Sequence, residues 1–281
     1  MKNLVSLTFL FLFCFCISCK KEDDIGISIL RDEGLGLYWD HNVSDYGRQY
    51  LFNFISNKST RDEYEFKFAY AISGSAVTVR LEEVIHKGKC QKFPGPWGDV
   101  CTSDGVMYIP EEELPTGNYD FKLVIGNVSI TSKLTVENDK VTLDVPPNSL
   151  FSNNIPTIYP LPKGLIYGSV VYSGKENEKF AKNLLKDLET LDLKPAVLPP
   201  YKYRYLDPER NQHLQATSWE PDEHSISIIY RSNADFKSVF DITKKHFELS
   251  GKKLTIGIFS TSKANEIHIS PYEEPRVYYG K

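Results

Sequence analysis

Histidines and acidic residues that lie close together in the chain are the first candidates for acid–base chemistry. Asp40 and His41 are adjacent and follow the apolar stretch 35–39. An imidazole beside a carboxylate can transfer protons near neutral pH, so this pair is a candidate half of a catalytic site. The competing interpretation, which we favour, is a polar turn at the end of a strand. The six histidines are scattered, at positions 41, 86, 213, 224, 246 and 268.

The motifs of the common enzyme classes are missing from the sequence. It has no Gly-x-Ser-x-Gly nucleophile elbow, no His-Glu-x-x-His zinc motif, no phosphate-binding loop and no Gly-x-Gly-x-x-Gly after a strand. We therefore predict a non-catalytic protein with no cofactor and no metal. The alternative is an enzyme whose residues meet only on folding, and it requires a deep pocket with several histidines and carboxylates.

A short loop rich in proline and aromatic residues is the first candidate for binding. Phe93 and Trp97 flank the sequence Pro-Gly-Pro. Prolines reduce the entropy lost on contact, and Phe and Trp are side chains that anchor interfaces or stack on sugars. The alternative is that Trp97 folds back over an open end of its own domain.

A second candidate is the long loop 201–224, which is unusual inside a compact domain and therefore often functional. Its candidate binding residues are Tyr201, Tyr203, Tyr205 and Trp219. The alternative is a plain connection between two strands.

The start of the chain has the pattern of a cleaved secretion signal. Lys2 precedes an apolar run at residues 4–17, which is shorter than the roughly 20 residues that a membrane-spanning helix needs. We expect residues 1–18 to be removed and residues 19–33 to form a polar tether. The charged residues that follow Cys19 are Lys20, Lys21, Glu22, Asp23 and Asp24.

This arrangement resembles the signal of bacterial lipoproteins, in which the cysteine at the cut carries the lipid. Ser18 fits that pattern directly before Cys19, although Cys16 replaces the usual leucine. The charged run 20–24 resembles the export signal of surface lipoproteins in Bacteroidota; the alternative is a solvated tether. The resemblance implies lipidation of Cys19 and exposure on the outer membrane, and it implies no activity.

Two of the five cysteines remain once the signal is removed and Cys19 is lipidated. Cys90 and Cys101 then enter an oxidising compartment, so we predict a disulfide that contributes about 2–3 kcal/mol. The alternative is a metal site formed by His86 and Cys90, but a metal needs three or four ligands and no second histidine lies nearby.

Length and composition limit the class of protein. A chain of 281 residues can form two domains, and its formal charge of −4 argues against a nucleic-acid partner. The 17 Tyr and 16 Phe, against 2 Met, favour β structure.

Residues 34–145 alternate between apolar and polar positions, which predicts strands with one buried face. Seven or eight short strands without a helix are typical of an antiparallel sandwich of immunoglobulin-like type. Prolines at 146, 147, 156, 160 and 162 then predict an extended linker over residues 146–163. The expected strands are 35–39, 50–55, 64–72, 77–81, 119–125, 128–130, 134–136 and 141–145.

Residues 164–281 have a different pattern, strand–helix–strand twice, with capping boxes at 173–176 and 232–235 and a helix end at Gly251. The order predicts a ferredoxin-like βαββαβ domain, the alternative being an irregular α+β domain. The expected strands are 165–172, 196–205, 225–230, 254–260 and 266–269.

The predicted fold class is therefore mainly β plus α+β. We expect a non-catalytic surface lipoprotein that acts as an accessory subunit of an outer-membrane assembly for uptake, secretion or barrel insertion. Its partners would be the outer membrane, through the lipid, and an outer-membrane protein. The alternative is a lipoprotein that binds glycans or peptidoglycan.

Overall fold

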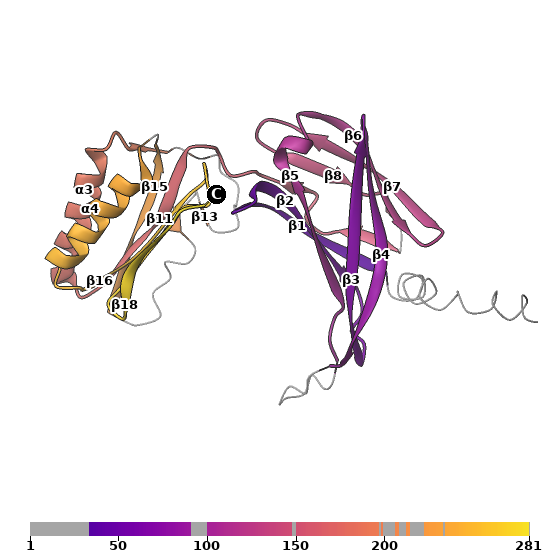
Figure 1. Cartoon of the computed structure of the whole chain (residues 1–281), viewed down its shortest axis with the longest axis horizontal. Coiled ribbons are helices and arrows are strands. Elements are labelled where there is room, and N and C mark those ends of the chain that lie inside the picture. The colour runs from indigo at the N-terminus through magenta and orange to yellow at the C-terminus, as the bar shows by residue number, and fades with distance from the viewer. Residues whose placement is uncertain are drawn as a thin grey trace, which may run out of the picture.

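The computed structural model describes residues 34–90, 100–147, 150–196, 198, 206–207, 212–213, 222–232 and 234–280. Within them the protein is mainly β, as predicted, with two large sheets and two α-helices that lie together at one end (Figure 1). None of the helices in these ranges is long and apolar enough to cross a membrane.

The first sheet has ten strands, and its spatial order is β10-β8-β7-β6-β4-β3-β5-β2-β1-β9. Its strands are β1 (Leu35–Ser44), β2 (Gly47–Ser56), β3 (Asp62–Ser73), β4 (Ala76–Lys89), β5 (Asp104–Pro110), β6 (Gly117–Ile125), β7 (Val128–Val136), β8 (Val141–Asp144), β9 (Phe151–Asn153) and β10 (Thr157–Ile158). A single turn of 3₁₀ helix, η1 (Glu111–Glu113), follows β5. We call residues 34–158 the first module.

The core of the first module is built from the alternating apolar positions of these strands. Trp39 is 1% exposed, and its ring lies 5.7 Å from that of Phe52, which in turn stacks on Phe121 at 5.8 Å. Burial of an aromatic side chain of this size stabilises the fold by about 1.5–3 kcal/mol. The Trp39 indole N–H also donates to the carbonyl of Ile155, so its one polar atom has a partner.

The pairing in this sheet differs from the expected antiparallel sandwich. β4 pairs with β6 in parallel, β1 pairs with β9 in parallel, and β3 meets β5 at one parallel bridge. The reason is β5, which was not predicted. After β4 the chain crosses the sheet so that β5 pairs with β2, and it then returns to pair β6 with β4 in the same direction. Gly105 makes this crossing possible, because a Cβ there would lie 2.2 Å from the carbonyl oxygen of Phe66.

The expected linker is in part a component of the first module. β9 extends the sheet beyond β1, and β10 extends it beyond β8. Phe151 is 1% exposed and Ile158 is 5% exposed, so both belong to the core. Sheet pairing and burial therefore fix the strands at 151–153 and 157–158, where an extended linker was expected.

The second sheet has the order β12-β15-β11-β16-β17-β18, and all its pairs are antiparallel. We call residues 164–280 the second module. Its elements are β11 (Leu165–Ser173), η2 (Lys175–Asn177), α3 (Glu178–Glu189), β12 (Lys194–Pro195), β13 (Leu206–Asp207), β14 (Gln212–His213), β15 (Glu223–Arg231), α4 (Phe236–Leu249), β16 (Leu254–Ser260), β17 (Glu266–Ser270) and β18 (Glu273–Tyr278).

Both helices cover the same face of this sheet (Figure 1). Their apolar residues lie on one side of each helix: Leu184 and Leu188 of α3, with Val239 and Phe247 of α4, are buried in one core with the strands. A helix that buries such a stripe gains most of its stability from that packing.

The predicted helix end at Gly251 is confirmed, whereas the two predicted capping boxes are wrong. Gly251, with φ +67°, ends α4, and the next amide donates to the carbonyl of Phe247 at 3.0 Å. The capping boxes are wrong, because neither α3 nor α4 has a side-chain cap. The chain forms the turn η2 before α3, and the Ser232 hydroxyl accepts from the amide of Ala234.

The segment between β12 and β15 lies largely outside the described residues, and with it most of the strand expected at 196–205. The short strands β13 and β14 pair with each other there, where a loop was expected.

Candidate functional site

His41 lies inside β1, which continues for three more residues, so the expected strand-end turn is wrong. Its side chain is 1% exposed. Nε2 donates to Oε2 of Glu111 at 2.8 Å, and Nδ1 accepts from the amide of Leu161 at 3.3 Å. Because an amide can only donate, these contacts fix the neutral imidazole with its proton on Nε2.

Arg48 on β2 lies beside this histidine, and each of its three guanidinium nitrogens donates a hydrogen bond. Nε donates to Oε2 of Glu111 at 2.8 Å. The two terminal nitrogens donate to the carbonyls of Thr261 at 3.0 Å and Leu161 at 2.5 Å. Thr261 belongs to the second module and Leu161 to the segment between the modules. One arginine therefore connects all three parts, and we call His41, Arg48, Glu111, Leu161 and Thr261 the junction.

The charges of the junction are strongly coupled. Burial alone would raise the pKa of Glu111, but the His41 hydrogen bond and the positive charge of Arg48 outweigh it and hold that pKa at about 2. Burial lowers the pKa of His41, and the Glu111 hydrogen bond opposes it only in part. At neutral pH the junction therefore holds one carboxylate, one guanidinium and one neutral imidazole.

This geometry determines what the junction can do. A general base needs an accessible nitrogen with a free lone pair, but His41 is buried and both of its ring nitrogens are engaged. Glu111 accepts from two donors, and the Nζ of Lys163 lies 3.4 Å from its second oxygen. The arrangement is suited to holding the modules together rather than to proton transfer.

A second contact connects the same two modules. The hydroxyl of Tyr278 on β18 donates to the carboxylate of Asp45, in the turn between β1 and β2. This hydrogen bond is the main reason why the pKa of Tyr278 is raised. The two modules are thus linked at two places on the first hairpin.

A cleft of about 870 Å³ opens beside the junction. Arg48 and Glu111 form part of its wall, Pro115 and Val136 contribute apolar surface, and Arg231 lies on the side of the second module. Its volume falls in the usual range of ligand pockets. Its charged groups on the junction side are committed to the internal hydrogen bonds described above.

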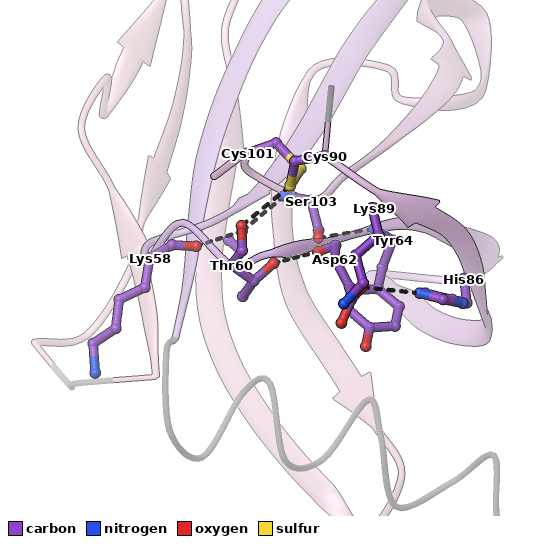
Figure 2. The surroundings of a disulfide bond; sticks show 10 residues. Lys58, Thr60, Asp62, Tyr64, His86, Lys89, Cys90, Cys101 and Ser103 are labelled. Carbon is purple, nitrogen blue, oxygen red and sulfur yellow. Dashed lines mark hydrogen bonds and ion pairs between the residues drawn. A yellow bond between two sulfur atoms is a disulfide. The ribbon is translucent and has the colours of Figure 1, made fainter. Parts of the chain in front are cut away.

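The predicted disulfide is present between Cys90 and Cys101, whose Cα atoms are 5.6 Å apart. Figure 2 shows it beside Thr60, which exchanges two backbone hydrogen bonds with Cys101 at 2.9 and 3.0 Å. The Ser103 hydroxyl accepts from the amide of Tyr64 at 3.0 Å. The disulfide thus joins the two described segments on either side of residues 91–99.

The alternative metal site is wrong, because Cys90 is in the disulfide and His86 faces Asp62 at 3.6 Å. Across the described ranges, no group of three His, Cys, Asp or Glu is placed to hold a metal ion.

The other predicted site residues lie outside the described residues. They are Cys19, Lys20, Lys21, Glu22, Asp23, Asp24, Phe93, Trp97, Tyr201, Tyr203, Tyr205 and Trp219.

Sequence reasoning named His41 but missed Arg48 and Glu111. One signal was available: Arg48 is the one charged residue of β2, and a charge in a mostly buried strand needs a partner. A partner 63 positions away cannot be read from the sequence. Comparison of the chain with protein-family models, with curated proteins and with solved structures finds no match.

Proposed function

We propose that this protein is a non-catalytic, lipid-anchored protein of the outer-membrane surface that acts as an accessory subunit of an outer-membrane protein assembly. Uptake, secretion and barrel-insertion machines are the classes that such a subunit would serve. The lipid would be carried by Cys19, and residues 19–33 would form the tether to the first module.

The observation that carries this proposal is the junction. A flexible two-module chain loses orientational freedom when it binds a partner through both modules, and this loss weakens binding. Arg48 removes part of that cost in advance, because it ties Leu161 and Thr261 to Glu111. A preset orientation suits a protein that contacts a large partner with two surfaces.

The finer fold assignment is part of the proposal. For the second module, the ferredoxin-like plan is supported by the strand order β12-β15-β11-β16, the antiparallel pairing and the two helices on one face. β17 and β18 would then be an extension of that plan. For the first module, an immunoglobulin-like origin is supported by the hairpins β1–β2 and β6–β7 around a single core.

The direct test is purification of the tagged protein from its own membranes in mild detergent, followed by mass spectrometry of the proteins that accompany it. A stoichiometric membrane protein is expected. A protein that elutes alone would contradict the accessory role.

Two pairs of variants sharpen this test. Cys19→Ala should release the protein from the membrane fraction, whereas Cys16→Ala should not. Arg48→Ala should keep the anchor but weaken recovery of the partner, whereas Arg80→Ala, on the exposed side of β4, should recover it normally. Membrane retention of Cys19→Ala would contradict the anchor, and equal recovery with both arginine variants would contradict the role of the junction.

A further inference from the structure

The second sheet has a face that the helices do not cover. Val170, Ile256, Ile258 and Ile267 point toward the helices and are buried in that core. Side chains alternate along a strand, so Ser169, Gly257 and His268 belong to the opposite face. In Figure 1 this is the side of β11 and β16 that is turned away from α3 and α4.

One cross-strand row on this face joins four strands. Ser169 of β11 pairs with Gly257 of β16, Gly257 pairs with His268 of β17, and His268 pairs with Arg276 of β18. A cavity of about 310 Å³ lies over this row, and Thr255, Phe259 and Glu273 also contribute to its lining.

The floor of the cavity is shaped by a residue without a side chain. A Cβ built on Gly257 would meet only the edge of the Phe259 ring, at 3.8 Å, so the backbone there could carry a side chain without a clash. The absence of a side chain leaves the hollow open between Ser169 and His268.

Ser169 supplies the second observation. It is 7% exposed, and it lines the cavity. A hydroxyl can both donate and accept, so Ser169 offers a molecule in the cavity a hydrogen-bonding group.

The polar groups of the rim have both signs. Arg276 and Glu273 lie 3.3 Å apart at the surface, and the imidazole of His268 is hydrogen-bonded to Glu266. The Glu273 carboxylate in the lining makes the site unfavourable for a phosphate or a carboxylate ligand. Donors and acceptors placed side by side, without an excess of positive charge, match a neutral ligand with many hydroxyl groups.

We propose that this cavity binds a neutral sugar residue of a glycan. Ser169 and Thr255 would hydrogen-bond to ring hydroxyls, Arg276 and Glu273 would bind hydroxyls at the rim, and Phe259 would form the apolar wall. The volume of the cavity fits one or two sugar rings and lies near the lower limit of about 300 Å³ for ligand pockets. The site does not depend on the accessory role proposed above, because a chain without a protein partner can still bind a glycan here.

The test is saturation-transfer difference NMR on the full chain in a detergent without a sugar headgroup. The probes are glucose, galactose, mannose and N-acetylglucosamine, with inorganic phosphate as the anionic competitor. At least one sugar should give a saturable signal that phosphate leaves unchanged. Ser169→Ala should weaken the affinity roughly threefold to tenfold, as expected for one lost hydrogen bond.

Two further variants keep the result interpretable. Gly257→Val fills the floor and should abolish the signal while the far-ultraviolet circular dichroism spectrum stays native. Ser225→Ala is the matched control, because Ser225 is an exposed serine of β15 that does not line the cavity. The absence of a signal from every sugar, a signal that survives Gly257→Val, or displacement of the sugar by phosphate would each overturn the proposal.

Discussion

Arg48 and Glu111 are 63 positions apart in the chain, and the Nε of Arg48 lies 2.8 Å from Oε2 of Glu111. The carboxylate orients the guanidinium so that its other nitrogens point at the carbonyls of Leu161 and Thr261. The relationship between these two residues of the first module therefore sets the position of the second.

Removal of the Arg48 side chain should loosen the two modules. Arg48→Ala leaves the partly buried Glu111 carboxylate with fewer donors and frees two carbonyls, so the free energy of unfolding should fall by about 2–4 kcal/mol. Small-angle X-ray scattering should show a larger radius of gyration. Arg80→Ala should change neither quantity, and an unchanged radius for Arg48→Ala would show that other contacts set the orientation.

Stability should fall on acidification in two stages. The pKa of His41 is lowered in the folded protein, so its contribution is complete above about pH 6.5 and declines as the pH falls below that value. The pKa of Glu111 falls from 4.5 to about 2, so its contribution is lost between those values. Unfolding in urea as a function of pH measures both stages.

A pair of histidine variants tests the first stage. His41→Gln should remove the decline below about pH 6.5, because glutamine can donate to Glu111 without titrating. His86→Gln should retain it, since the His86 side chain is 57% exposed. A decline of equal size in both variants would assign the effect to other groups.

Much of the first module was predictable because its strands alternate so regularly. In β6, Tyr119, Phe121 and Leu123 are buried and the intervening residues are exposed, as the sequence pattern implies. β5 escaped prediction because Gly105 and Pro110 weaken its pattern, and its place depends on how closely it approaches Phe66. β9 and β10 were not predicted because the prolines around them leave only short stretches, in which a strand pattern is hard to recognise.

The candidate site was predictable only in part, for a related reason. His41 stands out in the sequence because histidine beside aspartate is a familiar pair, yet its partners are Glu111 and Leu161. Contacts of this range are created by the path of β5 and by the segment between the modules. Local spacing contains no information about either.

Gly105 should be intolerant of any side chain. Gly105→Ala places a methyl group 2.2 Å from the carbonyl oxygen of Phe66, so β5 must shift away from β3. We expect a loss of about 2–3 kcal/mol in the free energy of unfolding, measured in urea. Gly117→Ala is the control, because its nearest neighbour is the Tyr119 ring at 3.5 Å; equal losses would contradict the crossing argument.

Reduction of the disulfide should destabilise the first module by about 2–3 kcal/mol, because Cys90 and Cys101 close a loop of 11 positions. Thermal unfolding with and without a reducing agent measures the difference. The double variant Cys90→Ala, Cys101→Ala should unfold at the temperature of the reduced protein and ignore the reducing agent. A response of this variant to the reducing agent would point to a different cysteine.

The pairing of β1 with β9 has a consequence for the order of events during synthesis. The Trp39 indole donates to the carbonyl of Ile155, which lies 116 positions later in the chain. One edge of β1 pairs with β9, which begins only at Phe151. The sheet of the first module is therefore still incomplete when its early hairpins have been synthesised, because its last two strands follow the prolines at 146 and 147. Contacts of such long range form slowly, so a cell must keep the unfinished sheet edge from aggregating until residue 158 is available.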